Sequence, residues 1–201
     1  KDPRQLKGKK VGVSSPGATA DLVAKYIFKH FGLETGRDVS VVYIGNEAPR
    51  YLALESGILD ASMLSVPENI MARQKGFVEL AFAADYIEFP QNGFGTSTKK
   101  IRENQDEIYR MVRATLRGLM FTTDQKNKEP SLDIIMKSWG VKSRSMAEEM
   151  YNYMARASLP DASISMAGLQ FLVDRQRENA KVTEPVDAAQ VHDSSFVDKA
   201  R

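Results

Sequence analysis

A run of small polar residues near the N-terminus, Ser14-Ser15-Pro16-Gly17-Ala18-Thr19, has the residue types of a binding loop. It follows a short apolar segment and precedes a segment whose apolar residues recur at helical spacing. The first N–H groups of a helix lack partners inside the helix, and the helix dipole favours negative charge beside them. We therefore predict that Ser14, Ser15, Gly17, Ala18 and Thr19 bind an anionic or polar group. The alternative is that Thr19 only caps the helix and that Ser14-Ser15 forms a turn.

Three further polar residues follow the second and third segments that we predict to be strands. Asn46 comes after the second, Ser65 comes after the third, and Asn69 lies in the helix that follows Ser65. Open α/β sheets bind ligands at the carboxyl ends of their strands. Asn46, Ser65 and Asn69 are therefore candidate ligand-binding residues as well.

Each of these later candidates also has a purely structural interpretation. Ser65 and Glu68 have the spacing of a helix capping box, so we expect Ser65 to cap a helix whatever else it does. Asn46-Glu47 is an ordinary helix entry. Arg50 could reach a ligand anion, but a helical arginine is more often solvated.

Residues typical of catalysis or metal binding are sparse. The chain has no cysteine, and its two histidines, His30 and His192, lie in unrelated contexts without a catalytic or metal-binding pattern. We assign no catalytic residue, no metal and no cofactor. The charge balance of 28 Lys+Arg against 26 Asp+Glu gives no basic stripe of the kind that binds nucleic acid or anchors to a membrane. The apolar runs are too short to span a bilayer.

The elements that position the candidates alternate between strand and helix up to residue 85. We predict strands at residues 10–13, 39–44, 61–64 and 78–82, and helices at 19–31, 49–56 and 67–75. This alternation predicts βαβ units and a parallel sheet. Gly32, Gly57 and Gly76 stand where the three helices should end.

The pattern changes after residue 85. Residues 86–97 contain Pro90, Gly93 and Gly95, and we predict a hinge or connector there. Residues 98–201 are expected to be mainly helical, with helices that begin at Ser131, at Ser145 with Glu148 as its capping partner, and at Ser163 or Ser165.

Several stretches resemble the type II periplasmic solute-binding proteins of the NMT1/THI5-like branch, which includes sulfonate, taurine and nitrate carriers. The first is Leu6-Lys-Gly-Lys-Lys-Val-Gly-Val with the serine-rich turn after it, and the second is Leu54-Glu-Ser-Gly-Ile-Leu-Asp-Ala with Ser65-Val-Pro67. The residues 164–176 and 191–196 are similar to the closing helix and tail of that family. The resemblance covers most of the chain.

The resemblance implies a fold and a function. The fold would be an α/β lobe at residues 1–85, a connector at 86–97, and at 98–201 the helical part of a second lobe. The function would be capture of a small anionic organic solute between two lobes, in the periplasm or an equivalent space outside the cytoplasm. The implied partners are that solute and the membrane permease of an ABC transporter, with no nucleic acid.

In the resembled family, the C-terminal helices pack on strands that come from an earlier part of the chain. We therefore expect that this sequence lacks an N-terminal part, the alternative being a single domain whose helices cover their own sheet. Met111, Leu116, Leu119 and Met150 would then form an exposed apolar patch, which predicts possible self-association.

Two other functional classes compete with solute binding. The same fold family includes enzymes that make the thiamin pyrimidine precursor, but their iron-associated cysteine cluster has no counterpart in a chain without cysteine. A protein that binds this pyrimidine precursor is a related alternative. The effector-binding domains of transcriptional regulators share the fold at similar length, but they normally follow a DNA-binding helix-turn-helix. Our main prediction is that the protein binds a solute and is not an enzyme.

Overall fold

The computed structural model of the protein describes residues 2–88 and 90–201. The chain divides into two compact units, residues 1–88 and 89–201, which we call the first and second unit. Each is described by itself. The connector that the sequence predicts at residues 86–97 stays a prediction. Residue 89, which falls within this range, lies outside the described residues.

The first unit is a three-stranded parallel sheet with flanking helices. A short 3-10 turn at Pro3–Leu6 leads into the alternating elements, which run in the order β1 (Lys9–Val13), α1 (Thr19–His30), β2 (Val39–Tyr43), α2 (Glu47–Glu55), β3 (Ala61–Ser62) and α3 (Glu68–Gln74). The strand order is β2-β1-β3, with Val11 opposite Val41 on one side and Ala61 on the other. The predicted parallel sheet is confirmed.

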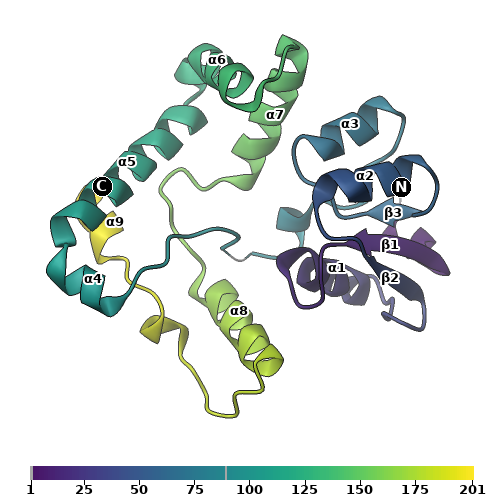
Figure 1. Ribbon diagram of the computed structural model, residues 1–201, viewed down its shortest axis with the longest axis horizontal. Helices are drawn as coiled ribbons and strands as arrows, with labels where there is room; N and C mark the ends of the chain where they lie inside the picture. The colour runs from purple at the N-terminus through teal and green to yellow at the C-terminus, as the bar shows by residue number, and fades with distance from the viewer. Residues whose placement is uncertain (1, 89) are drawn as a thin grey trace. The chain divides into compact units, whose positions relative to one another are not determined.

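Strand β1 lies in the centre and faces a different environment on each side (Figure 1). Val11 and Val13 are buried in one cluster with Ala24 and Phe28 of α1. The pleat turns Gly12 to the opposite face, where a Cβ atom would come within 2.4 Å of Leu59 Cδ1. Figure 1 shows α1 on one side of this sheet and α2 with α3 on the other.

The predicted fourth strand is wrong. Residues 78–82 form no strand in the described part of the first unit. Leu80 packs against the α1 cluster and Phe82 is buried, and a 3-10 turn follows at Ala83–Asp85. The apolar pattern of this segment therefore reflects burial against the core without strand pairing.

The helix ends of the first unit follow the glycines. Gly32, Gly57 and Gly76 all have positive φ, which a glycine adopts without the cost that a Cβ atom imposes. These three predicted stops are confirmed. The helix starts differ slightly from the prediction. For example, α2 begins at Glu47, two residues before the predicted start at Pro49.

The second unit is helical. Its elements are α4 (Thr98–Glu103), α5 (Gln105–Thr123), α6 (Lys128–Trp139), α7 (Arg144–Ala157), α8 (Met166–Asn179) and α9 (Ser195–Ala200), with short 3-10 turns at Gln125–Asn127 and Ala188–Gln190. Helix α5 packs on α9, α6 packs on α7, and α8 packs on the turn at Ala188–Gln190. No helix in the described ranges is long and apolar enough to cross a bilayer.

Two of the predicted helix starts in this unit are wrong. Helix α6 begins at Lys128, so Ser131 lies inside it and is buried. Pro130 occupies the first turn of that helix, where its missing N–H has no cost. Helix α7 is capped by Ser143, whose hydroxyl accepts from the Met146 N–H at 3.2 Å, and not by Ser145. Ser165 caps α8 as predicted, accepting from the Gly168 N–H.

The predicted apolar patch is covered in part. Leu116 is only 3% exposed and Met150 is fully buried, so the prediction that these two residues are exposed is wrong. Met111 stays 40% exposed. The helices bury some of these positions against one another, as α6 and α7 do around Met150.

Candidate functional site

The candidate residues of the first unit lie on the loops that leave the carboxyl ends of β1, β2 and β3. Hydrogen bonds between backbones tie these loops together. The Ile44 N–H donates to the Val13 carbonyl at 3.0 Å, and the Gly45 N–H donates to the Ser14 carbonyl at 2.9 Å. On the other side, the Met63 N–H donates to the Gly12 carbonyl at 2.9 Å. The three loops therefore form one edge of the sheet, as their order in the sequence predicts.

In the loop after β1, some of the backbone N–H groups already donate hydrogen bonds within the protein. The Ala18 N–H donates to the Ser15 carbonyl at 3.1 Å, and the Gly17 N–H donates to a carboxylate oxygen of Asp21 at 2.8 Å. Ala18 is the N-cap of α1, and Thr19 is its first residue, so the alternative that Thr19 caps the helix is wrong. Ligand contacts by Ser14, Ser15, Gly17, Ala18 and Thr19 stay a prediction.

Asp21 is a buried polar residue of this loop that the sequence pattern did not single out. Its side chain is fully buried, and besides the Gly17 N–H it contacts Lys25 Nζ at 2.8 Å and accepts from the Tyr43 hydroxyl at 3.4 Å. Burial opposes the charge of Lys25, but the hydrogen bond to Asp21 and the negative charge of Asp21 outweigh it and raise the pKa of Lys25. The signal in the sequence was an acidic residue in the first turn of a helix, with a lysine four residues later.

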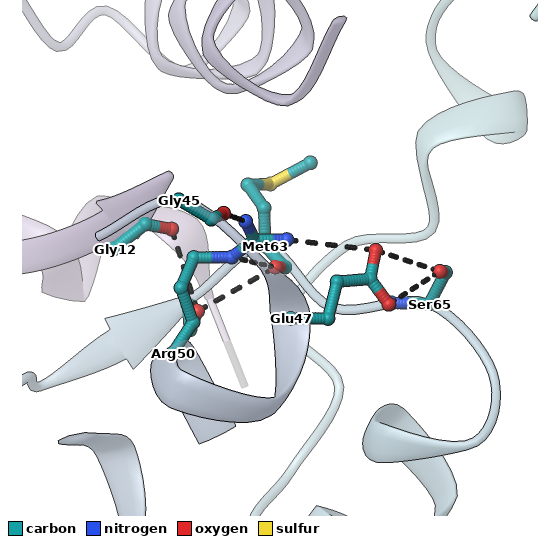
Figure 2. Close-up of polar contacts among 7 residues, drawn as sticks. Gly12, Gly45, Glu47, Arg50, Met63 and Ser65 are labelled. Atoms are coloured by element: carbon teal, nitrogen blue, oxygen red, sulfur yellow. Dashed lines mark hydrogen bonds and ion pairs between the residues drawn. The ribbon is translucent and has the colours of Figure 1, made fainter. Parts of the chain in front are cut away.

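The second and third loops are joined by side chains from α2 (Figure 2). Arg50 donates from Nε to the Met63 carbonyl at 3.1 Å and from Nη1 to the Gly45 carbonyl. Its guanidinium also lies 3.5 Å from the Glu47 carboxylate. Because these carbonyls follow β2 and β3, one side chain holds both loops at a fixed separation.

Arg50 is only 2% exposed, so the interpretation that it is solvated is wrong. Its Nε and Nη1 donate to backbone carbonyls of the protein, and contact of Arg50 with a ligand stays a prediction. Burial lowers the pKa of Arg50, while the charges of Glu47 and Glu68 act in the opposite direction. Arginine suits this position because its planar fork offers several donors in a fixed geometry.

Glu47 completes this arrangement and changes the predicted role of Ser65. The Ser65 hydroxyl donates to the Glu47 carboxylate at 2.7 Å, and the Ser65 N–H donates to the same carboxylate at 3.2 Å (Figure 2). The N-cap of α3 is Pro67, without a side-chain capping bond, so the predicted capping box of Ser65 and Glu68 is wrong. A carboxylate 18 residues upstream competes successfully for the hydroxyl.

The two asparagine candidates lie at the same edge but differ in exposure. Asn46 is the exposed N-cap of α2 and makes no side-chain capping bond. Asn69 lies in α3, where its Oδ1 accepts from the Ile70 N–H at 2.9 Å. The Asn69 Nδ2 is buried without a hydrogen-bond partner among the described residues. Whether Asn46, Ser65 and Asn69 touch a ligand stays a prediction.

Asp60 fixes the turn that precedes β3. Its carboxylate accepts from the Lys10 N–H at 2.8 Å and contacts Lys9 Nζ at 3.1 Å, which ties the turn before β3 to β1. These hydrogen bonds lower the pKa of Asp60. Over the described residues, no group of three or more His, Asp or Glu side chains is arranged to hold a metal ion.

Comparisons with known proteins agree with this architecture. A sequence model of the family described as NMT1/THI5 like matches residues 1–128. The chain is similar to a solved structure from Bordetella bronchiseptica RB50, with 19% identity and a TM-score of 0.67 over 100% of this chain and 66% of that one. It is also similar to the periplasmic aliphatic sulphonate binding protein SsuA from Escherichia coli, with 21% identity and a TM-score of 0.70 over 95% of this chain and 60% of that one.

No curated protein matches the chain. The two solved structures are longer, and the chain spans 66% and 60% of their lengths. At this level of identity the structural similarity establishes the fold. The predicted resemblance to NMT1/THI5-like proteins and the predicted α/β fold with a helical C-terminal half are both confirmed.

Proposed function

This chain belongs to the NMT1/THI5-like family, and we propose that it is the solute-binding part of an ABC-type transporter, working outside the cytoplasm. It would capture a small organic solute, for which the loop after β1 suggested an anion, and deliver it to a membrane permease. The observation that carries this proposal is the edge of the first unit, where the loops after three parallel strands are tied to one another. The name of SsuA, a sulphonate binding protein, supports it further.

A fixed edge of this kind suits capture because affinity depends on groups that are already in position. Arg50 and Glu47 hold the loops at Gly45, Met63 and Ser65 before any ligand arrives. Preorganisation reduces the conformational entropy that binding would otherwise cost. The proposed contacts are Ser14, Ser15, Gly17, Ala18, Thr19, Asn46, Ser65 and Asn69. Residues 86–97 would act as a hinge for closure on the solute.

The proposal predicts that a bound solute travels with the protein and leaves unchanged. Native mass spectrometry of protein purified without refolding should detect a small bound molecule, and denaturation should release it with the same mass. A released molecule that differs in mass from the one supplied would instead indicate catalysis and favour an enzyme.

The site is tested by substitution at the edge. Ser14→Ala should weaken binding of the identified solute by about 1–3 kcal/mol if the hydroxyl makes a hydrogen bond to it, as calorimetry would measure. Ser40→Ala is the matched control, because Ser40 is an exposed residue in β2 before the edge. Equal affinities for both variants would move the site away from the first loop.

A further inference from the structure

The edge of the first unit contains two acidic side chains that occupy donors expected to be available to a ligand anion. Asp21 accepts from the Gly17 N–H, and Glu47 accepts from both the N–H and the hydroxyl of Ser65. At Gly17 and Ser65, the protein's own carboxylates therefore occupy donors of two candidate ligand-binding residues.

The cations beside these carboxylates are also engaged. Lys25 pairs with Asp21 at 2.8 Å, and Arg50 divides its donors between two carbonyls and Glu47. Asp21 and Glu47 thus each have one basic partner, and Glu68 adds a further negative charge near Arg50. An incoming anion would have to displace an existing hydrogen bond or approach a carboxylate of like charge, and both are unfavourable.

The two carboxylates differ in what they can offer a ligand. Asp21 is fully buried, so it only removes a donor from the loop. The Glu47 side chain is 34% exposed. A carboxylate has about four acceptor sites, and the Ser65 N–H, the Ser65 hydroxyl and the Arg50 guanidinium contact it. Glu47 is therefore a partly exposed acidic side chain with a fixed position at the sheet edge.

We infer that Glu47 determines specificity at this edge, by accepting a hydrogen bond from an amine or amide N–H of the solute, and that Asp21 disfavours an acidic group at the neighbouring loop. This inference rests on the proposed function. It restricts the class of solute to molecules that present a hydrogen-bond donor to the first unit. If the solute also has an acidic group, that group binds outside the loops at Gly17 and Ser65.

The test uses the 201-residue chain and three small molecules of matched size: propylamine, propionate and β-alanine, which carries both groups. Saturation-transfer NMR detects weak binding of each, with dissociation constants from titration. We expect propylamine and β-alanine to bind and propionate not to bind. Glu47→Gln should weaken the binding of the two amines at least tenfold, because it replaces the charged acceptor by a neutral amide.

Two variants separate this role from a structural one. Glu55→Gln is the matched control, because Glu55 lies on the same helix, has the same 34% exposure and pairs with Lys75 at 3.0 Å. It should leave amine binding unchanged. Asp60→Asn is a second control, because Asp60 is a partly exposed acidic residue in the turn before β3 and not among the proposed contacts, and it should also leave amine binding unchanged. Circular dichroism of each variant checks that it is folded.

The outcomes distinguish the inference from the proposed function. Binding of propionate that Glu47→Gln does not change, with no binding of the amines, would overturn the inference and leave solute capture intact. Equal weakening of amine binding by Glu47→Gln and Glu55→Gln would also overturn it. No binding of any of the three molecules would count against both.

Discussion

The two units of this chain place their polar and apolar side chains differently. In the first unit, charged groups enter the interior with partners: Asp21, Asp38 and Arg50 are buried and hydrogen-bonded. Among the described residues, the buried side-chain atoms without a hydrogen-bond partner are Asn69 Nδ2 in the first unit and Ser131 Oγ, Tyr151 Oη and Arg177 Nε in the second. Most of the large apolar residues that stay exposed also belong to the second unit, among them Met120, Trp139 and Leu159.

This difference indicates which interactions stabilise each unit. The first unit has a sheet, and strand pairing brings residues far apart in sequence together, so polar side chains find partners across loops. The second unit has helices, which satisfy their own backbones but leave apolar faces that need another surface. Its side-chain contacts, such as Lys128 with Glu148, join neighbouring helices. We therefore expect the first unit to be the more ordered of the two.

The largest expected effects come from the core of each unit. Ile70 and Met150 are both fully buried, one in each unit, and truncation to alanine should cost roughly 4 kcal/mol in either case. Hydrogen exchange with mass spectrometry should show the lost protection in the unit that carries the substitution. Met71→Ala and Met154→Ala are the controls, at positions 36% and 37% exposed. If Met150→Ala costs no more than Met154→Ala, the second unit has no packed core at this position.

The next effect tests the link between the second and third loops. Arg50→Met keeps an apolar stem but removes the donors to Gly45 and Met63, and it should lower the free energy of unfolding by about 3 kcal/mol. Arg110→Met is the control, because Arg110 is 73% exposed in its pair with Asp106 and such pairs contribute little. Urea denaturation measures both. Similar midpoints for the two variants would mean that Arg50 does not hold the loops.

Substitution of one glycine in each unit tests the difference in packing between the two units. Gly12→Ala places a Cβ atom 2.4 Å from Leu59, which is 2% exposed, and should destabilise the first unit by about 2 kcal/mol. Gly118→Ala in α5 meets no atom within 4 Å and should stabilise the second unit by about 1 kcal/mol through helix propensity. Thermal unfolding should move in opposite directions for the two variants. Movement in the same direction would contradict the contrast in packing.

The smallest expected effect depends on pH. The pKa of Asp60 is lowered in the folded protein by the Lys10 N–H and Lys9, so its stabilising effect is present above the ordinary value of 3.8 and is lost as the pH falls through the folded value. Asp60→Asn should therefore reduce stability at pH 7 and differ less from the wild type at about pH 3. Urea unfolding at both pH values measures this. A difference that is independent of pH would exclude the carboxylate as its cause.

The family, the alternation from β1 to α3 and the ends of the three helices in the first unit were predictable from the sequence, although a strand predicted at 78–82 does not form. These follow from local signals, namely apolar periodicity and glycines such as Gly32 and Gly57 that accept positive φ. The sequence also predicted that the loops after three strands meet at one edge, because parallel strands share a direction.

Only the tertiary structure decided which partners the polar side chains take. Ser65 has the local spacing of a helix cap but donates to Glu47, and Arg50 has the local pattern of a surface residue but is buried between two loops. Asp21 likewise binds Tyr43, 22 residues away. A side chain with several accessible partners bonds to the one that the fold holds nearest, and burial makes an unpaired alternative costly. Local spacing carries no information about that competition.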